Sequence, residues 1–405
     1  MNSYTGFASR AKQNFGRPNS GRRFAFGKRS NRRRDNRENI DVSRFVKQAS
    51  QPADIAAAQP IAHKFTDFGF VSALAANVQR LGFSQPTPIQ DQTILPAMEG
   101  RDVIGLANTG SGKTGAYLLP LINAISQNRK LRLLVIAPTR ELAIQINDDF
   151  HRFAQGMNLD SAILVGGMPP RPQIMQLRKG PNFVIGTPGR LKDFQQSKRV
   201  NFGSFTTVVL DEVDRMLDMG FIEDIKYLMG QVPEKHQTLF FSATMPEKTL
   251  RLADQFLKNP VRSQIKSNRS ADNVEQNIVR AGSGQNKFDQ LKELLDKPEM
   301  EKVIIFGDTK FGVEKLSNNL QRDGYKADSI HGGKRQNQRQ KTLSMFRESK
   351  ISVLVATDVA ARGLDIKNVT YVINYTVPRT YDDYIHRIGR TGRANSKGCA
   401  YTFAE

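Results

Sequence analysis

The chain contains 405 residues, with 60 Lys and Arg against 39 Asp and Glu and a formal net charge of +21. With about 150 residues in a typical domain, this length favours two globular domains and a tail, and the charge favours polyanions as partners. A single cysteine, Cys399, excludes an intramolecular disulfide framework. No stretch reaches the roughly 18 apolar residues that cross a bilayer, so we expect a soluble, cytoplasmic protein.

The first 50 residues are strongly basic, with 13 Lys and Arg against three acids, a net charge of +10. Gly, Asn and Ser separate the charges without an apolar period, so this segment cannot bury enough surface to offset its ordering entropy. We therefore predict a basic disordered arm over residues 1–60. Aromatic residues lie between the basic ones, which suits stacking on unpaired bases. The alternative is an arm that only solubilises the chain.

Short apolar segments alternate with amphipathic ones from residue 61 onward, which predicts an α/β fold with parallel sheets covered by helices on both faces. In the first half we predict strands at 103–106, 133–136, 162–165, 183–185, 208–210 and 239–241. In the second half we predict strands at 303–306, 327–330, 353–356, 371–373 and 400–403. The polar segment 263–273 would link one domain over 61–262 to another over 274–405. Because the last strand reaches the C-terminus, we expect no helix to close the second sheet.

A glycine-rich loop in the stretch Ala107–Thr114 lies between a predicted strand and an apolar helix. This arrangement points backbone N–H groups and the positive end of a helix at phosphate oxygens. The residues that would line the phosphates are Thr109, Gly110, Ser111 and Gly112. Lys113 would reach the β- and γ-phosphates, and the Thr114 hydroxyl would hold Mg²⁺. Ala107 stands where the usual pattern has glycine, so a turn in an unrelated α/β protein is the alternative.

An acidic stretch follows another apolar strand, where Val208–Leu210 runs into Asp211-Glu212-Val213-Asp214. In a chain with a phosphate loop, two acids at the carboxyl end of a strand match the Walker B arrangement. Asp211 would hold Mg²⁺, largely through water, and Glu212 would orient and deprotonate the attacking water. Taken alone, such a stretch is also typical of a solvated turn.

Residues 65–403 resemble the DEAD-box ATP-dependent RNA helicases of superfamily 2, motif after motif in the family's order, and most closely the bacterial RhlE-like group. The resemblance implies two tandem RecA-like domains and RNA-stimulated hydrolysis of ATP, with ATP and Mg²⁺ as cofactors. It implies RNA as the partner, bound through backbone contacts that largely ignore sequence. Proteins of ribosome assembly or RNA decay are further partners that it suggests, and no membrane partner is expected.

Within this resemblance, Phe65 and Gln90 belong to the motif that recognises adenine. The aromatic ring would stack on the base, and the carboxamide would read its edge because it donates and accepts at once. Ser242-Ala243-Thr244 resembles the motif that couples hydrolysis to strand separation, by hydrogen bonding to Asp214. The residues assigned to this coupling are Asp214, Ser242, Thr244 and His386.

The resemblance also assigns RNA contacts to both halves of the chain. Those of the first half, each after a predicted strand, are Pro138, Thr139, Arg140, Gly167, Thr187, Gly189 and Arg190. Those of the second half are Thr309, Gln336, Arg339, Thr357 and Arg362, some of which would contact the other domain instead. Ligands bind at the carboxyl ends of strands in open α/β folds, and hydroxyls, backbone N–H groups and arginines suit phosphate and ribose.

The stretch His386–Arg393 reads His-Arg-Ile-Gly-Arg-Thr-Gly-Arg. In the family pattern Arg390 and Arg393 are arginine fingers on the γ-phosphate, a role worth about 10³ or more in rate. The alternative is a solvated helix start. Asp365 would meet the ATP ribose. The arginines and the phosphate loop lie in different halves of the chain, so we expect catalysis to need both halves.

Three positions depart from the family pattern: Asn108 replaces Gln, Val213 replaces Ala and Thr376 replaces Asp. The acids that carry the chemistry are intact, so we expect activity to survive. Two other functions remain open. One is an ATP-gated RNA clamp that does not unwind, and the other is a DNA-directed translocase, which Gln90 and the Asp-Glu-x-Asp pattern disfavour.

Overall fold

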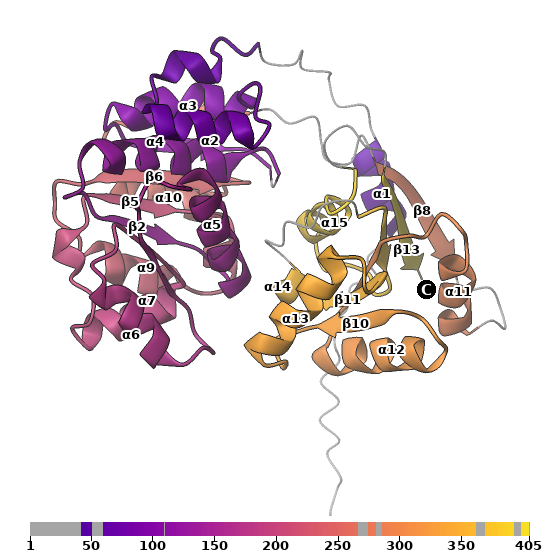
Figure 1. The fold of residues 1–405 in the computed structure, drawn as a ribbon. Coiled ribbons are helices and arrows are strands. Elements are labelled where there is room, and N and C mark those ends of the chain that lie inside the picture. Colours follow the sequence, from indigo (N-terminus) through magenta and orange to yellow (C-terminus); the bar gives the residue numbers. More distant parts are fainter. Residues whose placement is uncertain are drawn as a thin grey trace, which may run out of the picture. The chain divides into compact units, whose positions relative to one another are not determined.

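The computed structural model describes residues 42–50, 60–108, 110–265, 274–280, 286–361, 369–392 and 398–404. The chain divides into two units, Met1–Ile40, which lies outside the described residues, and Asp41–Glu405. The second unit contains two parallel sheets with helices on both faces (Figure 1). The predicted α/β fold class with two parallel sheets is confirmed. Among the described residues, no helix is both long and apolar enough to cross a membrane.

The first sheet has seven strands in the order β3-β4-β2-β5-β6-β1-β7, and every pair is parallel. The strands are β1 (Val103–Leu106), β2 (Leu133–Ile136), β3 (Ser161–Leu164), β4 (Phe183–Gly186), β5 (Thr207–Leu210), β6 (Gln237–Ser242) and β7 (Val261–Gln264). All but β7 were predicted. That strand reads Val-Arg-Ser-Gln at the edge beside β1, so it lacks the apolar run by which the others were recognised.

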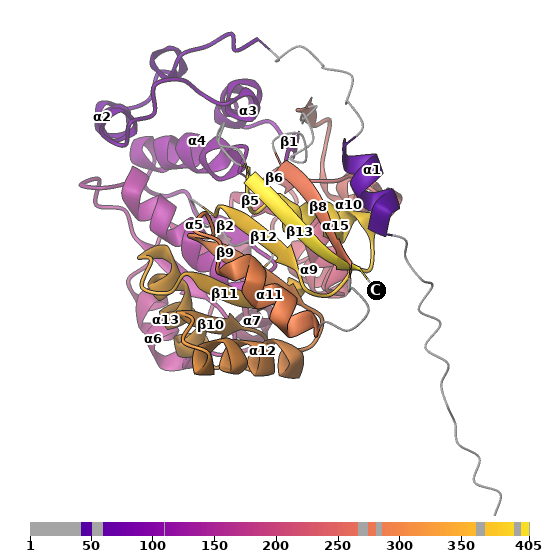
Figure 2. The same cartoon turned by 90° about the vertical axis from the view of Figure 1, so that its right-hand side faces the viewer.

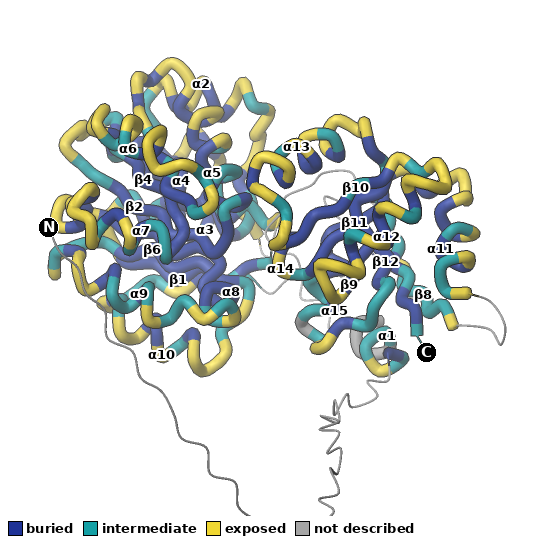
Figure 3. The backbone as a smooth tube through the Cα atoms, turned by 90° about the horizontal axis from the view of Figure 1, so that it is seen from below, coloured by how far each residue is buried: buried dark blue, intermediate teal, exposed yellow. Residues whose placement is uncertain are grey.

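Two apolar cores cover this sheet, because alternate residues of each strand point to opposite faces. Val103 and Val135 join the core made with η1 to α5, whereas Ile104 and Leu134 join the core made with α6 to α10. Figure 3 shows the strands buried between these layers. The helices are η1 (Phe65–Phe68), α2 (Ser72–Arg80), α3 (Pro88–Met98), α4 (Lys113–Gln127), α5 (Arg140–Phe153), α6 (Pro170–Arg178), α7 (Pro188–Gln196), η2 (Phe202–Ser204), α8 (Val213–Asp218), α9 (Ile222–Met229) and α10 (Glu247–Phe256).

The second sheet has six parallel strands in the order β10-β11-β9-β12-β13-β8. The strands are β8 (Val274–Arg280), β9 (Val303–Gly307), β10 (Ala327–Ile330), β11 (Val353–Thr357), β12 (Tyr371–Asn374) and β13 (Gly398–Ala404). The helices are α11 (Lys287–Leu295), α12 (Lys310–Arg322), α13 (Gln336–Arg347), α14 (Asp358–Ala361) and α15 (Tyr381–Ile388). Only β8 was not predicted, because Glu, Gln and Asn interrupt its apolar residues.

A helix lies inside the segment predicted to be a disordered arm. It is α1 (Val42–Ser50), and it contacts β8 and α15 of the second sheet (Figure 2). Val42 is buried, and the Phe45 ring lies 5.8 Å from the rings of both Tyr381 and Tyr384. The prediction of disorder was therefore wrong for these residues. The helix is short, and it is stabilised by packing on residues that lie more than 200 positions away in the sequence.

Candidate active site

The phosphate loop connects β1 to α4, and its glycines are required by the backbone. Gly110 and Gly112 have φ angles of 84° and 94°, in the left-handed region that side chains disfavour. A Cβ on Gly112 would also come within 2.7 Å of the Gln90 amide nitrogen. Lys113 is buried, and its ammonium donates to the carbonyls of Ala107 at 2.5 Å and Asn108 at 3.1 Å. The loop thus holds its own cation where phosphates would bind.

Gln90 joins α3 to the phosphate loop. Its Oε1 accepts from the Thr87 N–H and its Nε2 donates to the Gly112 carbonyl, both at 3.0 Å. The side chain is buried, and these two hydrogen bonds give both ends of its amide a partner within the protein. Phe65 is 9 % exposed and packs edge-on against Phe68 and Phe83. The adenine contacts expected of Gln90 and Phe65 stay predictions.

The predicted catalytic acids follow β5, two strands away from β1 in the sheet. Asp211 accepts hydrogen bonds on both oxygens, from the Glu212 N–H and from the Tyr117 hydroxyl, each at 2.9 Å. Burial and the neighbouring Glu212 raise the pKa of Asp211 to about 6, although Lys113 opposes the shift. Glu212 has a φ of 50°, and its carboxylate accepts from Arg215 at 3.0 Å. Such a backbone is costly for a non-glycine residue and is often found at functional sites.

The residues expected to hold Mg²⁺ offer the oxygen ligands that this ion prefers. Asp211 supplies a carboxylate, which accepts from the Tyr117 hydroxyl, and Thr114 supplies a hydroxyl. Among the described residues, no group of three His, Cys, Asp or Glu side chains could form an all-protein metal cage. Mg²⁺ usually needs only one or two protein ligands beside waters and phosphates, so this pair fits the ion.

Three of the predicted coupling residues contact one another, and the coupling role of His386 stays a prediction. The Asp214 carboxylate accepts from the backbone N–H and from the hydroxyl of Thr244, both at 2.9 Å, and the Asp214 N–H donates to the Ser242 hydroxyl at 3.3 Å. The hydrogen bonding that was expected between Asp214 and this motif is therefore present. Val213 is fully buried in the apolar core beneath β5, so its extra methyl groups point away from the acids.

The residues predicted to contact RNA in the first half lie where β2, β3 and β4 end. Thr139 precedes α5 and Thr187 precedes α7, so both lie at helix N-termini, where free N–H groups favour anions. Gly167 has a φ of 71°, and the Arg140 guanidinium lies against it. A Cβ on Gly189, in contrast, would meet no atom within 4 Å. Pro138 directly precedes Thr139, and the Arg190 guanidinium donates to the Met168 carbonyl at 3.4 Å.

Gln336 and Arg339, in the first turn of α13, have a protein partner in the first half of the chain. Both contact the carboxylate of Glu141, at 2.9 Å and 3.0 Å respectively. The alternative that these two residues serve a protein contact is thus favoured. Glu141 is buried and directly follows Arg140, but it was not among the predicted site residues. Thr357 ends β11 and is nearly buried.

A scan against protein families matches a DEAD/DEAH box helicase family over residues 87–252 and a helicase conserved C-terminal domain over residues 286–395. The chain is 45 % identical to the ATP-dependent RNA helicase CshA of Listeria monocytogenes over 344 residues, covering 84 % of this chain and 66 % of that protein. It is 45 % identical to DEAD-box ATP-dependent RNA helicase 20 of Arabidopsis thaliana over 351 residues, covering 84 % and 69 %. The chain belongs to the DEAD-box ATP-dependent RNA helicases.

Solved helicase structures resemble this chain along most of its length. Dbp5 of S. cerevisiae bound to RNA and ADP BeF3 has a TM-score of 0.76 at 27 % identity, with 84 % of this chain and 89 % of Dbp5 covered. Mss116p bound to ssRNA and AMP-PNP has a TM-score of 0.76 at 29 % identity, with 85 % and 76 % covered. Both sheets are therefore RecA-like domains of the helicase fold. The chain spans about two thirds of the length of the curated relatives.

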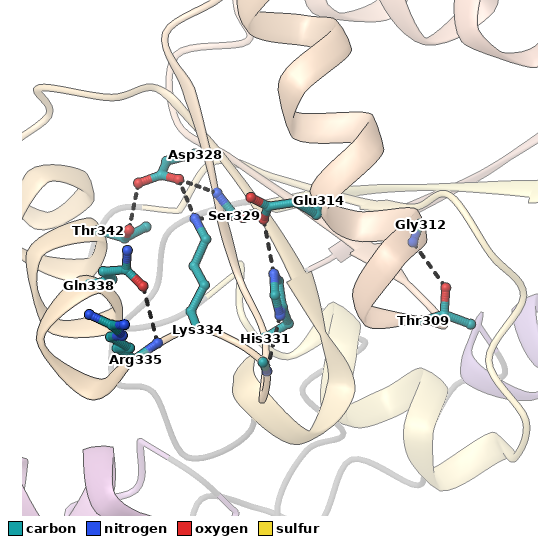
Figure 4. Close-up of polar contacts among 11 residues, drawn as sticks. Thr309, Gly312, Glu314, Asp328, Ser329, His331, Lys334, Arg335, Gln338 and Thr342 are labelled. Carbon is teal, nitrogen blue, oxygen red and sulfur yellow. Dashed lines mark hydrogen bonds and ion pairs between the residues drawn. The ribbon is translucent and has the colours of Figure 1, made fainter. Parts of the chain in front are cut away.

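In this helicase, a polar network that the sequence did not reveal holds the turn before α13 (Figure 4). His331 accepts from the Gly333 N–H through Nδ1 at 3.1 Å, so its Nε2 carries the proton and donates to Glu314 at 2.9 Å. Lys334 donates to Asp328 at 2.7 Å. Burial alone would raise the pKa of Glu314, but hydrogen bonds from Ser329 and His331 outweigh it and lower that pKa. The network places the helix start that carries Gln336.

Thr309 lies apart from this network, at the N-terminus of α12. Its hydroxyl accepts from the Gly312 N–H at 3.0 Å, as a helix cap does (Figure 4). A cap is a structural role that the residue fills without RNA. The RNA contact predicted for Thr309 stays a prediction.

Arg387, the first arginine of the stretch His386–Arg393, was not among the predicted site residues. It is 2 % exposed, forms two hydrogen bonds of 2.6 Å and 2.7 Å with Asp358, and donates to the Thr376 carbonyl at 2.6 Å. Arg387 contacts Thr376 through its backbone carbonyl, so this contact does not depend on which side chain stands at that position. Arg390 is buried, and its Nε donates to the carbonyl of His386 at 3.2 Å.

Several predictions fall on residues that the structure does not describe. They concern the site residues Thr109, Arg362, Asp365 and Arg393, the segment 266–273 of the predicted linker, and the arm outside 42–50. The start of that linker was placed too early, because β7 continues to Gln264.

Proposed function

We propose that this helicase couples RNA-stimulated ATP hydrolysis to local, non-processive separation of short RNA duplexes or to remodelling of RNA–protein complexes. The observation that carries the proposal is the placement of three motifs on neighbouring strands. The phosphate loop follows β1, Ser242 ends β6 and the catalytic acids follow β5, in the sheet order β5-β6-β1. Hydrogen bonds join the last two motifs directly. A nucleotide held by the first would thus meet both others at one sheet edge.

The chain's own residues supply most of the chemistry. Lys113 binds and neutralises phosphate oxygens, and Glu212 orients the attacking water and accepts its proton. Asp211 and Thr114 would hold Mg²⁺, which when bound neutralises charge between the β- and γ-phosphates. Arg390 and Arg393 complete the site by stabilising the charge that develops on the γ-phosphate. These arginines belong to the second RecA-like domain, so hydrolysis requires closure of the two domains.

Asp214 carries the effect of hydrolysis from the acids to β6. It lies two residues after Glu212, and its carboxylate binds both polar groups of Thr244. A change in the position of Glu212 therefore reaches the end of the neighbouring strand through short, buried contacts. We infer that this movement alters the RNA contacts at the same sheet edge and releases the strand.

RNA binding is supported by the donors at the ends of β2 and β4. The N-termini of α5 and α7, together with Arg140 and Arg190, would bind phosphates without reading bases. The named structures of Dbp5 and Mss116p contain RNA beside a nucleotide, which favours the same pairing of ligands here. We also propose that the protein belongs to an RhlE-like subgroup and acts in the cytoplasm. Its protein partners would be those of ribosome assembly or RNA decay.

The substitution Arg390→Ala tests the divided site. We expect it to reduce RNA-stimulated ATPase by about 10³-fold, because an arginine finger acts mainly on the transition state, while ATP affinity stays within about threefold. ATPase rates with single-stranded RNA and fluorescent-nucleotide binding measure the two effects. Arg379→Ala, which removes an exposed arginine paired with Asp308, is the matched control and should change neither.

Near-normal turnover of Arg390→Ala would refute the role of this arginine. Duplex release measured beside ATPase separates unwinding from an RNA clamp, since a clamp would hydrolyse ATP and bind RNA without releasing a strand. Stimulation by DNA as strong as that by RNA would instead favour a DNA-directed translocase.

A further inference from the structure

Tyr117 is a buried residue of α4 to which neither the sequence motifs nor the proposed chemistry assign a role. It lies four residues after Lys113 and is 0 % exposed, and its ring packs against Phe241 with centroids 5.4 Å apart. Its hydroxyl donates to Oδ2 of Asp211 at 2.9 Å, across 94 residues of sequence. Thr114 lies three residues before Tyr117 on α4, so the two side chains share one face of the helix. One buried hydroxyl therefore holds the carboxylate expected to bind Mg²⁺, on the helix face that also carries the other expected ligand.

We propose that Tyr117 is a positioning residue that sets the Asp211 carboxylate in place for Mg²⁺. The inference rests on the proposed ATPase function and deepens it. Oδ1 of Asp211 is held by the Glu212 N–H and Oδ2 by Tyr117, so the carboxylate cannot rotate without losing a hydrogen bond. Partners of this kind orient the ligands of a metal, and their loss typically costs 10–100-fold in metal affinity.

Packing alone does not account for a tyrosine at this position. The ring lies in the apolar core of the first sheet, and phenylalanine would fill the same space. A buried hydroxyl adds a desolvation cost that only its partners offset. Its hydrogen-bond partner, Asp211, comes from the expected metal site, although most of the surrounding side chains are apolar. The hydroxyl therefore serves that ligand.

The test uses Tyr117→Phe in the full chain, and affinity for a fluorescent ATP analogue is measured as MgCl₂ is raised from zero. Because the substitution leaves the nucleotide contacts intact, we expect affinity in EDTA to stay within about twofold of the parent. The Mg²⁺ concentration that gives half of the Mg²⁺-dependent tightening should rise about tenfold. RNA-stimulated ATPase should fall at low Mg²⁺ and recover at high Mg²⁺.

Tyr384→Phe is the matched control. Tyr384 is also 0 % exposed, and its hydroxyl donates to Gln276 at 2.7 Å in the second RecA-like domain. We expect this variant to lose comparable thermal stability while its Mg²⁺ requirement stays unchanged. Phe241→Leu supplies a second comparison, because it loosens the packing of the Tyr117 ring without removing the hydroxyl. It should also leave the Mg²⁺ requirement unchanged.

A parental Mg²⁺ requirement in Tyr117→Phe would overturn the inference. A shift of the same size in Tyr384→Phe or Phe241→Leu would overturn it too, because general destabilisation or ring packing would then explain the effect. If the parent protein itself showed no Mg²⁺-dependent nucleotide binding, the proposed ATPase function would fail, and the inference would fail with it.

Discussion

Gly189 occupies a position where a side chain would meet open space, in the first turn of α7. The backbone there does not require glycine, unlike that of Gly112 in the phosphate loop, which has a φ of 94°. Glycine inside a helix costs roughly 0.5–1 kcal/mol relative to alanine. Because neither packing nor backbone geometry requires this glycine, we expect that a ligand approaches the backbone closely at this helix N-terminus. In this helicase the ligand would be an RNA phosphate.

Gly189→Ala should therefore separate stability from binding. We expect the free energy of unfolding to stay the same or rise by up to about 1 kcal/mol, because alanine restricts the unfolded chain. RNA affinity should fall several-fold, because the new methyl group occupies the space of the phosphate. Gly230→Ala, at the C-terminal end of α9, is the control and should leave RNA affinity unchanged. Equal RNA affinities for the parent and Gly189→Ala would show that RNA does not approach this turn.

Helix α1 is an ordered element within the N-terminal segment that was predicted to be disordered. It covers part of the second RecA-like domain beside β8 and α15, where Phe45 and Val46 pack against the core that contains Tyr384. The segment that precedes the first RecA-like domain in the sequence therefore contains a helix that packs on the second RecA-like domain. We infer that α1 contributes to the stability of the edge strand β8.

Phe45→Ala tests this contribution. Replacing a fully buried phenylalanine by alanine lowers the free energy of unfolding by about 3–5 kcal/mol. Because the Phe45 ring is only partly buried, we expect this free energy to fall by about 1–2 kcal/mol. Hydrogen exchange of the β8 and α15 amides should become correspondingly faster, whereas that of β1 should not change. Arg44→Ala alters an exposed neighbour in the same helix and should leave all of these rates unchanged. Unaltered exchange in Phe45→Ala would mean that α1 does not stabilise β8.

At the scale of the whole molecule, charge is unevenly distributed along the chain. Residues 1–40 contain 11 Lys and Arg against two acids, a net charge of +9 out of +21. Because α1 begins only at Val42, this basic segment can be removed without touching the helix. Counterion release makes the salt dependence of RNA binding proportional to the number of phosphates that the protein neutralises.

Deleting residues 1–40 should therefore weaken RNA binding and flatten its salt dependence, by a slope of about 0.7 for each phosphate released on single-stranded RNA. Titrations of RNA affinity at several KCl concentrations measure this slope. Deleting residues 1–50 serves as the comparison, because it removes α1 as well and should lower the stability of the second domain, with little further change in slope. A slope equal to that of the full chain would indicate that the arm only solubilises the protein.

Much of the fold and of the candidate site followed from the sequence alone. Eleven strands were recognisable because their apolar runs lie between turn residues, and the motifs from Ala107 to Arg390 could be placed because most of them are contiguous and follow a strand. Local signals of this kind depend only on side-chain period, turn chemistry and spacing. The fold class, the family and the phosphate loop were therefore predictable.

Only the tertiary structure decided which distant residues meet. Strands β7 and β8 have weak local patterns and helix α1 has only a short one, and all three pack on neighbours that are distant in the sequence. Tyr117 meets Asp211 across 94 residues, and Gln336 meets Glu141 across 195. Such pairs depend on strand order and on the direction of side chains leaving each element. A single sequence specifies these contacts physically, but no local period reveals them.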